Sequence, residues 1–495
     1  MQRKFLTNLA LLLFLNILVK PFYIFGIDRT VQNIVEATDY GFYFTIFNFA
    51  FLFSILLDAG LTNFNNRNIA QNQHLLQKHF SNLVVLKFLL AIVYVAVTFL
   101  VALIIGYNAA QLKLLAWVGF NQFLLSFILY LRSNVSGMLM FKTDSFLSVL
   151  DRILMILICG VLIWGNVTGG KFRIEWFVYA QTAAYLLTLA VAFAIVIRKA
   201  AFKKLSFNLP FFLVIIKRSM PFAILVLLMA IYNRVDSVFI ERILKGDLGN
   251  QQSGIYAQAF RLLDAANQFA FLFAVLLLPI YSRMIKLKRP IEEMVRMPFS
   301  ILITVAIIVA VGSFYYRQEL MNLLYPRHLD EPIGDFTARL GESSRIYGIL
   351  MFCFLGTCTM YVFSTLLTAN GNLKQLNLVA LGGISINFAL NIALVPVYQA
   401  TGSAWASLTT QIVTSLLQVI LVQYYFRFKV NYRFILTIIL FTAGVILFNW
   451  ISKKIPINWL YSLTFMVVLS FILAGLMRMV SIRSFIGILK QRETE

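Results

Sequence analysis

Long apolar segments recur along almost the whole chain, and short polar segments separate them. Nearly all of them are long enough for a helix that crosses the hydrocarbon core of a bilayer, which takes about 20 apolar residues. The pattern predicts such helices at residues 5–27, 40–62, 83–105, 112–131, 146–165, 174–197, 219–240, 254–281, 298–316, 346–369, 376–396, 402–425, 434–451 and 457–477. The predicted fold is therefore an all-α polytopic membrane protein with about 14 transmembrane helices.

Composition agrees with a membrane protein and changes how the charge is interpreted. Hydrophobic residues make up 60% of the chain, charged residues 13%, and the mean hydropathy is +0.83. A net charge of +22 would suggest a nucleic-acid partner if it lay on one face. The Lys and Arg residues instead concentrate in alternate loops, about twice as many in one set as in the other. This bias predicts that both termini are cytoplasmic, and we expect no nucleic-acid partner.

Motifs of the common enzyme classes are missing from the sequence. It contains no Gly-x-x-x-x-Gly-Lys-Ser/Thr loop for nucleotide phosphates and no Gly-x-Ser-x-Gly nucleophile turn. The three cysteines fall in predicted helices without metal-ligand spacing. Asp28, Glu36 and Asp39, in the predicted first outer loop, lack the spacing of a catalytic carboxylate pair. We therefore predict a protein that is not an enzyme and that needs no metal or other cofactor.

An internal repeat is visible in the apolar pattern. The second predicted helix contains Phe49-Ala50-Phe51-Leu52-Phe53 and the eighth contains Phe269-Ala270-Phe271-Leu272-Phe273. A Gly-x-Tyr precedes each of them, Gly41-Phe42-Tyr43 and Gly254-Ile255-Tyr256. A chance match of one pentapeptide in a Phe-rich chain is the alternative. The paired match favours two six-helix pseudo-symmetric lobes, 1–205 and 206–425, followed by two additional helices and a tail, 426–495.

Five charged residues in the predicted spans form a candidate site. Ionisable groups at bilayer depth cost at least about 2.5–3.5 kcal/mol each and usually face a cavity or a partner. At about 1.5 Å per residue, Lys20 and Arg234 both lie roughly 22 Å from the inner surface, and Arg261 roughly 20 Å. Three cations in one layer suggest an anion site, so we predict that Lys20, Arg234 and Arg261 bind substrate.

Carboxylates accompany these cations. Arg261 and Asp264 are three residues apart on one helix face, and Asp236 is positioned to meet Arg261 on the next helix. Asp58, Asp236 and Asp264 are candidates for ion coupling or charge pairing. The alternative for Arg261, Asp236 and Asp264 is mutual neutralisation between helices. Asp58 and the Asp151-Arg152 pair lie near predicted helix ends, where we expect them at the membrane interface.

Several short stretches occur in an order that resembles one transporter family. They are Tyr40-Gly41-Phe42-Tyr43, Leu57-Asp58-Ala59-Gly60-Leu61, Arg67-Asn68-Ile69-Ala70, Asn233-Arg234-Val235-Asp236, Gly254-Ile255-Tyr256-Ala257, Pro279-Ile280-Tyr281-Ser282-Arg283, Ala369-Asn370-Gly371-Asn372, Asn387 to Asn391, Val395-Pro396 and Gly402-Ser403-Ala404-Trp405-Ala406. Together they resemble the polysaccharide-transporter branch, the O-antigen-type flippases, of the multidrug/oligosaccharidyl-lipid/polysaccharide exporter superfamily. Lys20 matches no motif of that family.

This resemblance implies two six-helix lobes around a central cavity, plus two extra helices. It also implies alternating-access flipping of a polyprenyl-diphosphate-linked oligosaccharide to the outer leaflet of a bacterial plasma membrane, for surface polysaccharide assembly. The expected partners are that lipid-linked oligosaccharide, membrane lipids and a coupling H⁺ or Na⁺, with the protein acting as a monomer. Two alternatives stay open: a multidrug exporter of the same superfamily, which would need a more acidic cavity, and an oligosaccharide polymerase acting at the outer face.

Overall fold

The computed structural model describes residues 14–16, 18–62, 65, 69, 74–138, 140–165, 172–200, 207–327, 331–429 and 431–479. All regular elements in these ranges are helices, which confirms the all-α prediction. The chain forms two compact units, called here the N-terminal unit (residues 1–257) and the C-terminal unit (258–495). The predicted boundary between the lobes, at residues 205 and 206, lies outside the described residues, so the lobe division stays a prediction.

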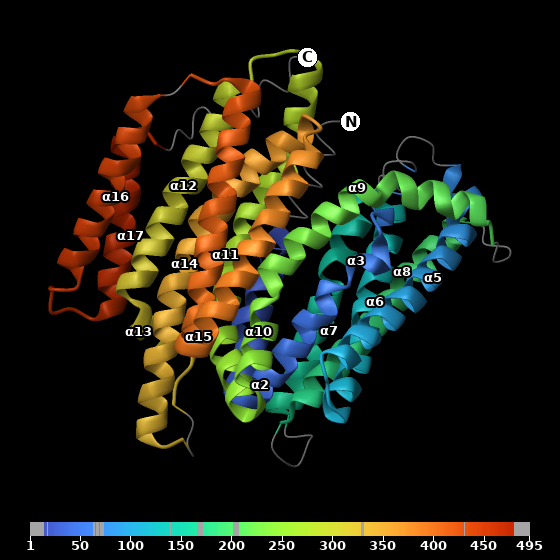
Figure 1. The fold of residues 1–495 in the computed structure, drawn as a ribbon, viewed down its shortest axis with the longest axis horizontal. Coiled ribbons are helices and arrows are strands. Elements are labelled where there is room, and N and C mark those ends of the chain that lie inside the picture. The colour runs from blue at the N-terminus through green and yellow to red at the C-terminus, as the bar shows by residue number, and fades with distance from the viewer. Residues whose placement is uncertain are drawn as a thin grey trace. The chain divides into compact units, whose positions relative to one another are not determined.

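The N-terminal unit is a bundle of apolar helices (Figure 1). Its elements are η1 (Tyr23–Asp28), α2 (Arg29–Leu52), α3 (Ile55–Asp58), α5 (Leu75–Ile104), α6 (Ala109–Gly137), α7 (Phe141–Trp164), α8 (Ile174–Ala200), α9 (Leu209–Arg234), α10 (Asp236–Leu244) and the first turns of α11 (Gly246–Lys286). Helix α6 packs against α2, α5, α7 and α8, and α10 packs against α2. Helix α6 is therefore central to this unit.

The C-terminal unit continues α11 and adds six helices (Figure 1). They are α12 (Glu292–Tyr315), α13 (Arg317–Leu324), α14 (Ile333–Ala369), α15 (Leu373–Phe426), α16 (Tyr432–Ser452) and α17 (Trp459–Leu476). Helix α14 packs between α12 and α15, while α16 and α17 pack against each other and against α12. The predicted additional pair of helices therefore attaches through α12.

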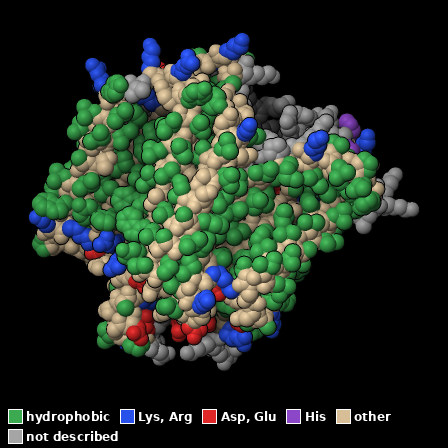
Figure 2. Space-filling view, viewed as in Figure 1, with side chains coloured by type: hydrophobic (Ala, Val, Ile, Leu, Met, Phe, Trp, Pro, Cys, Tyr) green, Lys and Arg blue, Asp and Glu red, His purple; other side chains and the backbone are tan. Residues whose placement is uncertain are grey.

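Hydrophobic side chains cover the outer surfaces of these helices. Within the described residues, nine helices are long and apolar enough to cross a membrane. On α16, Leu436, Ile439 and Leu440 are each more than half exposed. Over the C-terminal unit, Figure 2 shows a broad hydrophobic band with Lys, Arg, Asp and Glu side chains gathered at its ends. Surfaces this apolar face lipid rather than water, so the fold is that of a polytopic membrane protein.

Several helices, among them α7, α9 and α14, begin earlier than the hydropathy pattern predicts. Helix α9 starts at Leu209 rather than 219, because the Asn208 side chain accepts a hydrogen bond from the backbone N–H of Phe211 and Pro210 occupies the first turn. Helix α7 starts at Phe141 rather than 146, and α14 at Ile333 rather than 346. Most of the predicted long outer loop, 317–345, is thus helical. Charged residues can occupy helix ends because their long side chains reach the interface.

Sharp turns at single residues join several spans into hairpins. Glu36 (φ 67°) interrupts α2, and Gln399 (φ 51°) interrupts α15. Across the second turn, Ser403 Oγ donates to Asn391 Oδ1 at 2.6 Å. Twelve residues of straight helix would span about 18 Å, so the two arms of α15 must fold back on each other. These arms correspond to the predicted helices 376–396 and 402–425.

The two glycines of the predicted repeat meet where α2 crosses the start of α11. A Cβ on Gly41 would lie 1.9 Å from the carbonyl oxygen of Asn250, and a Cβ on Gly254 would lie 1.8 Å from that of Ala37. The two backbones therefore touch. Polar side chains bridge the same region, with Thr45 and Ser253 joined by a 2.8 Å hydrogen bond. Only glycine allows helices to approach this closely.

We expect Gly41→Ala and Gly254→Ala each to destabilise the N-terminal unit. Overpacking costs about 1–3 kcal/mol in ordinary cores, and here the added carbon would meet a backbone oxygen that cannot move aside. The measurement is the apparent melting temperature of the purified protein in detergent. Gly334→Ala is the matched control, because a Cβ there has no neighbour within 4 Å. If all three variants melted at the same temperature, this would contradict the close backbone contact between α2 and α11.

Candidate functional site

Lys20 lies in a group of charges inside the N-terminal unit. It is half-buried, and the charges of Arg152, Asp151 and Arg132 act on it. The Arg152 guanidinium lies 4.7 Å from the centre of the Tyr23 ring and 3.6 Å from an Asp151 carboxylate oxygen. We define the cationic group as Lys20, which precedes η1, Arg132 on α6 and Arg152 on α7. Ammonium and guanidinium groups in such a setting bind phosphate oxygens by charge-assisted hydrogen bonds.

Asp28 is a buried carboxylate that accepts hydrogen bonds from two side chains. Asp28 is the last residue of the π-helical turn η1 and is 3% exposed. Tyr40 donates to its Oδ1 at 2.9 Å, and Gln32 donates to its Oδ2 at 3.3 Å. The Asp28–Tyr40 bond closes the hairpin whose turn is Glu36. The prediction of an outer loop around residues 28–39 was therefore wrong. The chain reverses direction at Glu36 alone, and Asp28 lies in the buried bundle.

Arg152 was misplaced by the sequence-based interpretation. With α7 beginning at Phe141, Arg152 lies three turns inside the helix rather than near its end. The first turn of α7 holds Asp144, which accepts from Arg132 Nε at 2.8 Å. The positive end of the helix dipole also stabilises an acidic side chain at that position. A helix start at Phe141 places the Asp151-Arg152 pair in the interior and not at the interface.

Arg234 and Asp236 occupy the junction between α9 and α10. Arg234 is the last residue of α9, half-buried, with its guanidinium 5.2 Å from the centre of the Phe51 ring. Asp236 is 1% exposed and accepts a 2.8 Å hydrogen bond from the Tyr256 hydroxyl. Helix α9 begins at Leu209, before the predicted start at 219, and the depth of Arg234 in the membrane stays a prediction. The shared layer of Lys20, Arg234 and Arg261 stays a prediction as well.

Arg261 and Asp264 lie on α11 within the C-terminal unit. Both side chains are half-buried, and their spacing places them on one face of that helix. Their roles in substrate binding and ion coupling stay predictions.

Asp58 has a buried ionic partner that the sequence analysis did not identify. Lys87, on α5, is 1% exposed, and its Nζ lies 2.6 Å from Asp58 Oδ1. The same ammonium donates to Leu57 O and to Ser126 Oγ, each at 3.0 Å. Asp58 also accepts from the backbone N–H of Thr62 at 3.3 Å. This ammonium thus has three acceptors, which offsets the cost of burying its charge.

The fold and these interior charges define a polytopic membrane protein with ionisable groups inside its helical bundle. The model of the family described as polysaccharide biosynthesis protein matches residues 6–285, more than half of the chain. The chain belongs to this family. No curated protein sequence matches it.

Solved structures of transporters share the fold. The lipid II flippase MurJ in an inward closed conformation has a TM-score of 0.66 and 13% identity, over 97% of this chain and 98% of that one. An outward-facing multidrug resistance MATE family transporter of the MOP superfamily has a TM-score of 0.59 and 12% sequence identity, over 84% of this chain and 93% of that one. A MOP superfamily transporter from Pyrococcus furiosus has a TM-score of 0.59 and 13% sequence identity, over 84% of this chain and 95% of that one. It is described as having a binding pocket of reverse polarity. At these identities the likeness establishes the fold.

We predict that Lys87→Met and Asp58→Asn each destabilise the protein, because either change leaves a charge of the pair without its partner. The expected loss for Lys87→Met is about 3 kcal/mol. The double variant Lys87→Met/Asp58→Asn should recover most of this loss, since it removes both charges. Thermal unfolding of the purified variants measures the effect. A Lys87→Met protein as stable as the wild type would show that the ion pair does not stabilise the fold.

Proposed function

We propose that the protein flips a polyprenyl-diphosphate-linked oligosaccharide from the cytoplasmic to the outer leaflet of a bacterial plasma membrane. The observation that carries this proposal is the cationic group of Lys20, Arg132 and Arg152 inside an apolar bundle. A family of polysaccharide biosynthesis proteins supplies the class of substrate. A lipid II flippase with the same fold shows that this architecture can serve lipid-linked substrates.

The chemistry of such a substrate sets the task. A diphosphate-sugar head group is too polar to cross hydrocarbon, whereas the polyprenyl chain stays in the bilayer. Lys20 and Arg152 hold the diphosphate through charge-assisted hydrogen bonds, and Arg234 and Arg261 are further candidates for binding the substrate. Two six-helix lobes, 1–205 and 206–425, rock around a central cavity and expose it to each side in turn.

An ion gradient drives the outward step in this proposal. Asp58, Asp236 and Asp264 are the candidate coupling carboxylates. Asp58 and Asp236 have partners in Lys87 and Tyr256, so binding H⁺ or Na⁺ to either would weaken an existing contact. Such a change can bias one conformation over another. The protein acts as a monomer with both termini in the cytoplasm.

The cationic group favours a flippase over a multidrug exporter. Arg152 and Arg132 are interior guanidinium groups, and guanidinium matches phosphate geometry in a way that an apolar or cationic drug cannot use. The same placement of charge inside the bundle argues against a polymerase, whose reacting groups would lie at the outer surface.

In a flippase-deficient bacterium, we expect the wild-type protein to restore surface glycan. Lys20→Ala and Arg152→Gln should lower restoration about tenfold or more, because a hydrogen bond to a charged group contributes about 1.5–3 kcal/mol. Lys20→Arg should retain most of the activity. Glycan is measured by gel and lectin staining, at membrane levels of protein verified by immunoblot.

Lys113→Ala is the matched control, since Lys113 is an exposed cation of the same unit. Restoration by Lys20→Ala and Arg152→Gln at the level of Lys113→Ala would remove the cationic group from substrate binding. If Lys113→Ala also failed to restore surface glycan, the losses in Lys20→Ala and Arg152→Gln would reflect net charge rather than the cationic group.

A further inference from the structure

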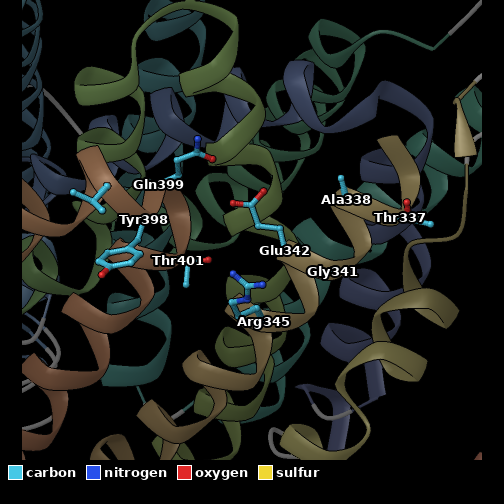
Figure 3. A pocket seen from close by; sticks show the side chains of 9 residues that line it. Thr337, Ala338, Gly341, Glu342, Arg345, Tyr398, Gln399 and Thr401 are labelled. Atoms are coloured by element: carbon cyan, nitrogen blue, oxygen red, sulfur yellow. The ribbon is translucent and has the colours of Figure 1, made fainter. Parts of the chain in front are cut away.

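A pocket of about 480 Å³ opens in the C-terminal unit. It lies between the first turns of α14 and the hairpin turn of α15 (Figure 3). Its lining includes Thr337, Gly341, Glu342, Arg345, Tyr398, Gln399 and Thr401. Its volume falls within the range of about 300–1,000 Å³ that is usual for ligand sites.

The distribution of basic residues along α15 indicates that the pocket lies at the outer end of the C-terminal unit. The far end of α15 is followed by Arg427, Lys429 and Arg433, a basic segment of the kind found on the cytoplasmic side. The hairpin turn at Gln399 is at the opposite end of the same two arms. The segment beside it carries both signs, with Arg339 donating to Glu331 at 2.8 Å. A pocket here faces the side to which the glycan is delivered.

The lining groups match the chemistry of a sugar ring. Figure 3 shows Glu342 and Arg345 on α14 beside Gln399 and Thr401 of α15. A carboxylate accepts hydrogen bonds from sugar hydroxyls, and a guanidinium donates to them. Tyr398 is 57% exposed at the hairpin turn, where its ring can cover the apolar C–H face of a sugar while its hydroxyl stays in water.

Other ligand classes fit this lining less well. A diphosphate would be repelled by Glu342, and Arg345 is the one cation in the lining. A divalent cation such as Ca²⁺ takes six to eight oxygen ligands, often several carboxylates, whereas the lining holds one carboxylate. An apolar drug would remove the charged and amide groups of the lining from water.

We propose that this outer pocket binds a sugar unit of the transported glycan. The proposal rests on the flippase function and adds a second site to it, specific for carbohydrate rather than for diphosphate. Because the pocket meets the glycan only on the outer side, binding there lowers the free energy of the delivered state and opposes return of the head group.

The glycine at the pocket wall permits a clean test. A Cβ at Gly341 has no neighbour within 4 Å, so Gly341→Trp can fill the pocket without disturbing the helix. Gly334 is equally open and lies two turns earlier on the same face of α14. Helical side chains lean toward the N-terminus, so the indole of Gly334→Trp would point away from the pocket. Gly334→Trp is therefore the matched control.

The experiment is saturation-transfer NMR on the full-length protein in lipid nanodiscs. The probes are free glucose, galactose, mannose, rhamnose, N-acetylglucosamine and N-acetylgalactosamine. We expect transfer to at least one sugar from the wild type and from Gly334→Trp, and about tenfold less from Gly341→Trp, a loss of about 1.4 kcal/mol. Tyr398→Phe should keep the signal, and Tyr398→Ala should lose it. Excess inorganic pyrophosphate should leave it unchanged.

Three results would overturn the inference: transfer to none of the sugars, equal transfer from Gly341→Trp and Gly334→Trp, or loss of the signal with pyrophosphate. The assay requires no transport. Sugar binding without restoration of surface glycan would therefore count against the flippase alone, and restoration without sugar binding would count against the pocket alone.

Discussion

The cost of holding a charge inside an apolar helical bundle governs this structure. An ionised side chain in such a place must have a partner, a cavity or a substrate. Lys87 has its partner in Asp58 on a neighbouring element, with two further oxygens completing the contacts of the ammonium. Arg152 pairs with Asp151, whose charge also acts on Lys20, and Arg132 pairs with Asp144. The second arrangement is the one we assign to an anionic substrate.

Close backbone contact supplies the framework for these charges. Gly41 and Gly254, which the sequence repeat relates to each other, meet where α2 crosses α11. Each is followed two residues later by a buried tyrosine, Tyr43 and Tyr256. Tyr256 binds Asp236, and Tyr43 accepts from Gln181. Small residues therefore set the distance between helices, and the tyrosines that follow them connect each helix to a polar group elsewhere in the unit.

The sequence predicts the class of fold well because long apolar runs have few alternatives in a membrane. It predicts helix ends poorly, since Asn208 and Pro210 start α9 within a basic segment that hydropathy assigns to a loop. The error matters for the site, because it moved Arg152 to the interface. Lys20 is conspicuous in the sequence as a lone cation in an apolar run, and its role in substrate binding stays a prediction. The Lys87–Asp58 pair was missed because its members are 29 residues apart, and only the packing of α3 on α5 joins them.

The most direct test of the account is translocation in proteoliposomes of a fluorescent polyprenyl-diphosphate-N-acetylglucosamine, followed by its accessibility to an external quencher. The account predicts that the wild-type protein accelerates exchange between leaflets relative to protein-free vesicles, and that Arg152→Gln abolishes this acceleration while Lys113→Ala retains it. Equal rates for wild-type and Arg152→Gln vesicles, or a wild-type rate no higher than that of protein-free vesicles, would contradict the assignment of the cationic group to a diphosphate-linked substrate.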